Sequence, residues 1–239
     1  MKKLSLIVAL VASVALLGSC LRGSDPQPER VGGMTFVNTF IEANGAFYLV
    51  DRNTIQGLYP LDYRTYGPSW PVYYPGEGRR LEIYSSYEDA RLVDTTFSMQ
   101  DSVYYSSIVY GTHDDPRHFI TEDRIPDGVD DPAAIAAVRF YNLANTERRV
   151  TLRIGEIESV AAFRNRPLET PASGKQGEDF IPVAIGNYTV TVVDEEGETV
   201  AIRQGTVDLP AGSYTSIFLT GDERDPRTFY VGIVRQWVN

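Results

Sequence analysis

The sequence predicts an all-β protein built from two tandem immunoglobulin-like antiparallel β-sandwich domains. Three observations support this fold class. A stretch of 25 residues occurs twice, which indicates a duplicated domain. The chain holds 15 tyrosines, 14 prolines and 20 glycines, a composition typical of many short strands and turns. Short β-branched and aromatic runs separated by turn residues recur along each copy, as expected of a sandwich.

The duplicated stretch comprises residues 96–120 and residues 206–230. The two copies align without a gap at an offset of 110, and eight of the 25 positions are identical. Unrelated segments of ordinary composition share roughly one or two. The identical pairs are Thr96/Thr206, Tyr104/Tyr214, Ser106/Ser216, Gly111/Gly221, Asp115/Asp225, Pro116/Pro226, Arg117/Arg227 and Phe119/Phe229. A second match, Phe36/Phe140 and Asn38/Asn142 at an offset of 104, places the start of each repeat and makes the second repeat the longer one between these anchors.

Each repeat is predicted to open with a hairpin. In the first, residues 34–41 and 46–50 are β-branched and aromatic runs on either side of a turn. In the second, residues 137–143 and 149–154 repeat the pattern, and the latter alternates apolar and polar side chains as a half-buried strand does.

Later strands are predicted from similar runs. Pro71-Val72 and Pro182-Val183 occupy corresponding places in the two repeats. Residues 194–197 (DEEG) and 210–213 (PAGS) are typical turns. The remaining predicted strands cover residues 81–84, 188–193, 199–204, 214–219 and 229–234. The predicted domains are therefore residues 34–124 and 137–239, joined by a linker at 125–136 in which any helix has one or two turns.

The N-terminus has the pattern of an export signal. Lys2 and Lys3 precede an apolar run, and residues 1–19 are predicted to be removed. Residues 17–20 (LGSC) resemble the bacterial lipobox, which implies cleavage before Cys20 and lipid on its thiol. Leu21 at the next position resembles the outer-membrane sorting class, and the domains then face either the periplasm or the outside. Residues 20–33 are predicted to be a flexible, lipidated tether.

Composition excludes several classes of partner. The net charge is −10, which argues against nucleic acid and against adsorption to anionic lipid, since both need a basic surface. Cys20 is the only cysteine, so the chain forms no internal disulfide.

One bacterial domain family is similar to this chain. The order FYN, VTLRIG, NYTVTV and LPAGSYTSIFLTG in residues 140–221 resembles the family called domain of unknown function 4397. The resemblance covers residues 137–236, and residues 34–124 through the internal repeat. In the first repeat Gln100-Asp101-Ser102 departs from it where the second has Pro210-Ala211-Gly212. The resemblance implies a sandwich outside the cytoplasm and implies no reaction.

The sequence offers little chemistry. His113 and His118 with Asp114 and Asp115 suggest a metal cluster, but the second copy has Glu223 and Thr228 at the histidine positions. We therefore expect a solvated turn, no metal and no cofactor. The shared Asp-Pro-Arg-x-Phe pattern is interpreted as structural. Nucleophile, phosphate and zinc motifs are absent, so we expect no enzyme, although carboxylates paired only in three dimensions stay open as a hydrolase alternative.

The aromatic middle of the first repeat is the one predicted binding site. Its tentative ligand-binding residues are Tyr63, Tyr66, Trp70, Tyr73 and Tyr74, because tyrosine and tryptophan rings suit sugars or a protein partner. The alternative is that these rings cover the sandwich or pack against the second repeat. We thus predict a non-enzymatic cell-envelope lipoprotein, a structural or interaction module of the outer membrane. The second hypothesis is a glycan-binding accessory lipoprotein that uses these aromatic residues, so the expected partners are the membrane and a glycan or envelope protein.

Overall fold

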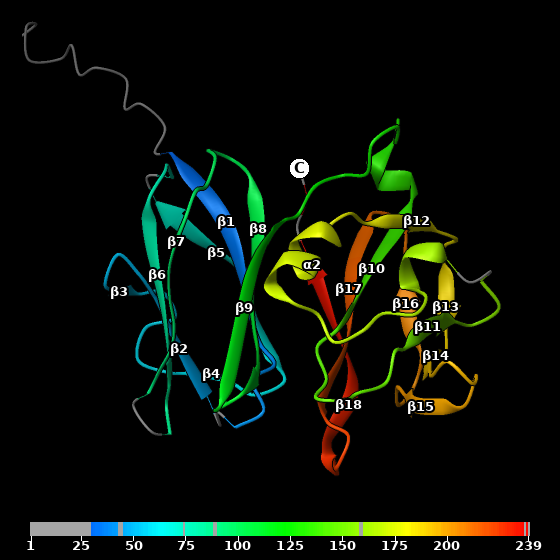
Figure 1. The fold of residues 1–239 in the computed structure, drawn as a ribbon. Coiled ribbons are helices and arrows are strands. Elements are labelled where there is room, and N and C mark those ends of the chain that lie inside the picture. Colours follow the sequence, from blue (N-terminus) through cyan, green and yellow to red (C-terminus); the bar gives the residue numbers. More distant parts are fainter. Residues whose placement is uncertain are drawn as a thin grey trace, which may run out of the picture. The chain divides into compact units, whose positions relative to one another are not determined.

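A computed structural model describes residues 30–42, 45–73, 75–87, 90–157, 160–236 and 238, apart from the side chains of 68, 69 and 73. The predicted signal peptide, Cys20 and most of the predicted tether lie outside these residues. Val31–Asn239 forms one compact unit, which is almost entirely β-structure (Figure 1). The predicted all-β sandwich class is confirmed.

The first repeat folds into two sheets. One has the strand order β5-β1-β8-β9, and the other has the order β3-β2-β6-β7 with β4 paired to β2. Its strands are β1 (Val31–Asn38), β2 (Gly45–Val50), β3 (Asn53–Thr54), β4 (Leu61–Asp62), β5 (Thr65–Tyr73), β6 (Arg79–Ser85), β7 (Arg91–Phe97), β8 (Tyr104–Thr112) and β9 (Asp115–Glu122).

The second repeat follows the same plan. Its sheets have the orders β12-β10-β17-β18 and β11-β14-β15. A separate short pair, β13-β16, consists of the strand just before β14 and the strand just after β15 in the chain. Its strands are β10 (Ala136–Asn142), β11 (Thr151–Ile154), β12 (Ile181–Val183), β13 (Gly186–Tyr188), β14 (Val190–Val193), β15 (Thr199–Ile202), β16 (Val207–Leu209), β17 (Ser213–Asp222) and β18 (Asp225–Gln236). Its short helices are η1 (Pro132–Ala134) in the predicted linker, η2 (Ala161–Phe163) and α2 (Pro171–Gln176).

The register of the strands supports the duplication. In each repeat the first strand runs parallel to a strand within the duplicated stretch, β8 in the first repeat and β17 in the second: Phe36 pairs with Ser107, and Phe140 pairs with Ile217. These partners differ by the same offsets, 104 and 110, that the sequence alignment shows. The predicted correspondence of Pro71 and Pro182 also holds, because they pair with Gly33 and Ala137 respectively. Each sandwich therefore has one parallel pairing among its antiparallel ones.

The two opening hairpins predicted from the sequence are wrong. Residues 34–41 and 46–50 do contain strands, but β1 and β2 lie in opposite sheets of the first sandwich. The same holds for β10 and β11 in the second. The short turn carries the chain from one sheet to the other, since the apolar side chains of both strands face a common core.

Each sandwich has its own core, and a third cluster joins them. The first core includes Phe36, Tyr48 and Ile83, and the second includes Phe140, Leu152 and Val192. The third, which we call the inter-repeat cluster, consists of Val37, Ile108, Tyr110, Phe119, Tyr141, Leu143, Phe218 and Val234. It draws on β1, β8 and β9 of one repeat and on β10, β17 and β18 of the other, so both of these sheets are covered on both faces.

A run of aromatic rings crosses the inter-repeat cluster. Ring centroids lie 5.6 Å apart for Tyr110 and Phe119, 5.2 Å for Phe119 and Tyr141, and 5.8 Å for Tyr141 and Phe218. Offset and edge-on contacts at these distances stabilise aromatic pairs beyond the area they bury. The duplicated stretch contributes Tyr110, Phe119 and Phe218 and therefore forms part of the surface through which the repeats join.

A buried ion pair lies beside this cluster. Arg139 on β10 donates a 2.6 Å bond to Asp123, which directly follows β9, and both side chains are about 1% exposed. The duplicated serines complete the network. Ser106 donates to Asp123 at 2.7 Å, and Ser216 accepts from Arg139 at 2.7 Å. The pair thus ties the end of the first repeat to the first strand of the second.

No helix in the described ranges is long and apolar enough to cross a bilayer.

Candidate functional site

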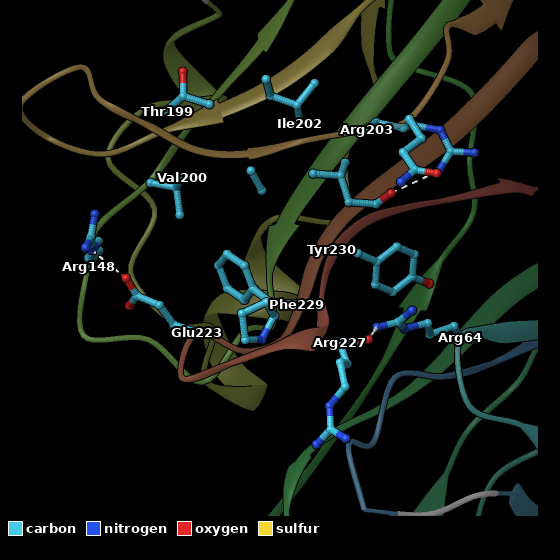
Figure 2. A pocket seen from close by; sticks show the side chains of 14 residues that line it. Arg64, Arg148, Thr199, Val200, Ile202, Arg203, Glu223, Arg227, Phe229 and Tyr230 are labelled. Carbon is cyan, nitrogen blue, oxygen red and sulfur yellow. Dashed lines mark hydrogen bonds and ion pairs between the residues drawn. The ribbon is translucent and has the colours of Figure 1, made fainter.

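A groove of about 790 Å³ lies along one side of the second sandwich (Figure 2). Its walls are β15 and β18. Each is the edge strand of its sheet, with no further described strand paired on its outer side. A turn of the first repeat, between β4 and β5, contributes Arg64 to the same groove. The groove is therefore built by both repeats.

The strands position its side chains by ordinary alternation. Phe229 and Tyr230 are neighbours on β18, so their rings point to opposite faces of the strand. Phe229 packs against the core of the second sandwich. Tyr230 lies under Arg64, whose guanidinium carbon is 4.3 Å from the centroid of the Tyr230 ring. Val200 and Ile202 on β15 line the opposite wall, and Ile202 is 64% exposed.

Four arginines line the groove, in a chain whose net charge is −10: Arg64, Arg148, Arg203 and Arg227. Two of them are neutralised. Arg148 bonds Asp194 at 2.9 Å and Glu223 at 2.8 Å, and Arg227 bonds Asp225 at 2.9 Å.

The other two have no carboxylate partner within the described ranges. Arg203 donates Nη1 to the Val231 carbonyl at 2.9 Å, and its Nε is buried without a hydrogen-bond partner. Arg64 donates to the Arg227 carbonyl and covers the rings of Tyr63 and Tyr230. Two guanidinium charges are thus uncompensated at one edge of the protein. Burial raises the pKa of Tyr230 to about 12, so its phenol is neutral at neutral pH.

The predicted aromatic site is divided among different environments. The Tyr63 hydroxyl donates to the Thr228 carbonyl at 3.1 Å, so Tyr63 packs against the second repeat. Trp70 packs against the first core and folds over Gly67, where an added Cβ would lie 2.1 Å from the indole nitrogen. Tyr66 is 38% exposed and lines a small hollow with Arg64 and Tyr230.

The other two predicted residues are Tyr73 and Tyr74. Tyr73 ends β5, but its side chain is outside the described part of the structure, as is all of Tyr74. Tyr63 and Trp70 thus pack within the protein, as the alternative to ligand binding proposed. Ligand binding by the five aromatic residues stays a prediction.

The groove residues were missed because sequence reasoning favoured aromatic density. Arg64 directly follows Tyr63, and Tyr230 stands where the first copy has Ile120. The nearly exclusive use of arginine as the basic residue was a visible signal, since guanidinium groups suit planar anions and aromatic stacking.

The histidine loop has no metal-binding arrangement. His118 shares a 2.9 Å hydrogen bond with Ser107, and burial lowers the pKa of its ring to about 3. His113 lies in the exposed turn between β8 and β9. The described ranges hold no group of three or more histidine, cysteine or acidic side chains placed to bind a metal.

Comparisons with known proteins assign no family to the chain. No family model matches the chain, and no curated protein matches it. Among solved structures it is similar to a carbohydrate-binding module of family CBM26 from Eubacterium rectale Amy13K, determined in complex with maltoheptaose. The identity is 11%, the match covers 87% of this chain and 97% of that one, and the TM-score is 0.25. A TM-score this low carries no argument about function.

Proposed function

We propose that this protein is a non-enzymatic lipoprotein of the bacterial cell envelope that binds a glycan in the groove between β15 and β18. In this proposal the tandem repeats are a rigid binding module, and lipid on Cys20 holds the module at the outer membrane. The binding site is moved from the aromatic segment predicted from sequence to the groove beside it.

The observation that carries the proposal is the joint construction of the groove. Arg64 from the first repeat stacks on Tyr230 of the second, and the inter-repeat cluster fixes the two repeats in one unit. Binding sites are concave, with aromatic and apolar walls and a few fixed polar groups. The groove combines Phe229, Val200 and Ile202 with arginine side chains in this manner.

Glycan binding is tested by replacing the ring that supports Arg64. Tyr230→Ala removes the ring over which Arg64 lies, so Arg64 loses its position in the groove, and we expect signals on a glycan array to fall by at least roughly tenfold. Tyr59→Ala is the matched control, because Tyr59 is 81% exposed and lies outside the groove. An intact protein that binds no glycan on the array would contradict the proposal, as would equal losses in the two variants.

The anchor is tested separately. Cys20→Ala removes the thiol to which the first lipid would be attached, so we expect palmitate labelling and membrane association to disappear. Labelling that persists in this variant contradicts the lipoprotein assignment and leaves the glycan test unaffected.

A further inference from the structure

The charge of the groove points to the class of glycan. Arg64 and Arg203 have no carboxylate partner within the described residues, in a chain with 32 acidic residues against 22 basic ones. Both arginines contact consecutive residues of β18. Arg203 donates a hydrogen bond to the Val231 carbonyl, and Arg64 covers the Tyr230 ring. Both side chains line the same groove, together with Tyr230 and Val231. One ligand in the groove can therefore contact both.

We propose that the groove binds an acidic oligosaccharide whose uronate carboxylates pair with Arg203 and Arg64. Its sugar rings lie against the apolar surface formed by Phe229 and Val200. This inference rests on the proposed glycan-binding function and specifies its ligand. A guanidinium group matches a planar carboxylate with two parallel hydrogen bonds, and arginine is favoured over lysine where such anions are recognised.

The edge geometry favours a glycan over a peptide. An extended peptide would bind by adding a strand to β18, which requires the outward main-chain groups of that strand. At Val231 the carbonyl is already taken by Arg203 at 2.9 Å, so the middle of the edge is blocked. A ligand recognised by side chains has no such conflict. Nucleic acid is disfavoured by the net charge of −10.

Arg148 and Arg227 are not expected to bind the ligand carboxylates. Each is paired with a carboxylate, Arg148 with Asp194 and Glu223, and Arg227 with Asp225. A ligand carboxylate would have to displace those partners. The uncompensated pair, Arg203 and Arg64, is therefore the expected recognition element.

The test compares ligands that differ only in charge. Binding of oligogalacturonate is measured by calorimetry beside its methyl ester, in which the carboxylates are neutral, and beside galactose oligomers of the same length. We expect oligogalacturonate to bind and the two neutral ligands to bind roughly tenfold or more weakly. We also expect its affinity to fall as salt is added, because ion pairs at an exposed groove are screened.

Charge removal in the protein provides the second arm. The variant Arg64→Gln with Arg203→Gln keeps a side chain able to donate a hydrogen bond but loses both charges. Its affinity for oligogalacturonate is expected to fall by roughly ten- to a hundredfold. Arg153→Gln is the matched control, because Arg153 is exposed on β11 and does not line the groove. Melting temperatures of both variants show whether the fold is intact.

The outcomes are distinguishable. Equal binding of acidic and neutral oligosaccharides overturns the inference and leaves the glycan-binding function in place. Poly-glutamate that binds as tightly as oligogalacturonate overturns it in favour of an acidic peptide. If no oligosaccharide binds the intact protein at all, the proposed function fails together with the inference. Unchanged affinity in a folded double variant also overturns it.

Discussion

Two pairs of ionised residues in this protein lie in contrasting environments. Arg139 and Asp123 are fully buried and satisfied by each other and by two serines. Arg64 and Arg203, at the groove, keep charges that no described carboxylate neutralises. A buried pair fixes structure because separating its members leaves a charge in an apolar environment, whereas an uncompensated charge at a surface is available to a ligand.

Removing one member of the buried pair should therefore be costly. Asp123→Asn leaves the Arg139 guanidinium buried without a counter-charge, and we expect the free energy of unfolding to fall by about 3–5 kcal/mol. Urea denaturation measures the change. Asp179→Asn is the matched control: it breaks a 2.6 Å pair with Arg124 whose side chains are 60% and 46% exposed, so the loss should stay below about 1 kcal/mol. Equal losses in the two variants would show that the buried pair has no special role.

The individual residues of the site were the feature least predictable from the sequence. Tyrosine and tryptophan density pointed to Tyr63 and Trp70, yet these two pack against the second repeat and the first core. Nothing in one sequence shows that Arg64 reaches Tyr230, because the two are far apart in the chain and meet only through packing of the repeats. A prediction based on local composition finds aromatic residues, but it does not find which of them are left facing solvent.

The strands were predictable from the sequence, and their pairing partners were not. Runs of β-branched residues located β6, β14, β15, β17 and β18, and the turn at 194–197 joins β14 to β15 as expected. The opening hairpins were wrong because a short turn between two strands is compatible with pairing and with a crossing between sheets. The choice depends on the parallel pairing of β1 with β8, a contact between residues about 70 positions apart.

Gly111 and Gly221 are identical in the two copies because the local backbone conformation requires glycine at both positions. Gly111 and Gly221 have φ of +93° and +101°, which favour glycine. A Cβ at Gly221 would lie 2.1 Å from the Thr228 carbonyl oxygen, and one at Gly111 would lie 2.3 Å from that of Asp115. The hairpins β8–β9 and β17–β18 therefore require glycine for both conformation and space.

Gly221→Ala should thus destabilise the second hairpin by at least about 2 kcal/mol, since strain and a clash with backbone add together. The midpoint of urea unfolding measures this. Gly205→Ala separates the two causes: Gly205 also has a positive φ, +73°, but no atom lies within 4 Å of an added Cβ. We expect it to cost about 1–2 kcal/mol. A smaller effect at Gly221 than at Gly205 would contradict the steric explanation.

The duplicated stretch joins the two repeats, a structural role that its sequence did not reveal. The hairpins β8–β9 and β17–β18 supply one face of each sandwich to a shared interior, so neither repeat has a complete surface of its own. The segment that contains α2 strengthens this junction, because the Glu169 carbonyl accepts hydrogen bonds from Tyr110 at 2.9 Å and from Arg117 at 3.1 Å. The groove depends on the same junction, since Arg64 belongs to one repeat and Tyr230 to the other.

The two repeats should therefore unfold together. We expect calorimetry of residues 31–239 to show one transition, with equal calorimetric and van't Hoff enthalpies, because the inter-repeat cluster couples the two cores. Phe218→Ala, at a buried member of that cluster, should lower the free energy of unfolding of the whole unit by about 3–5 kcal/mol. Leu58→Ala, at a side chain that is 90% exposed, should leave it within about 0.5 kcal/mol. Two separate transitions in the unaltered protein, with Phe218→Ala shifting only one of them, would mean that the repeats are independent domains and that a groove shared between them has no fixed geometry.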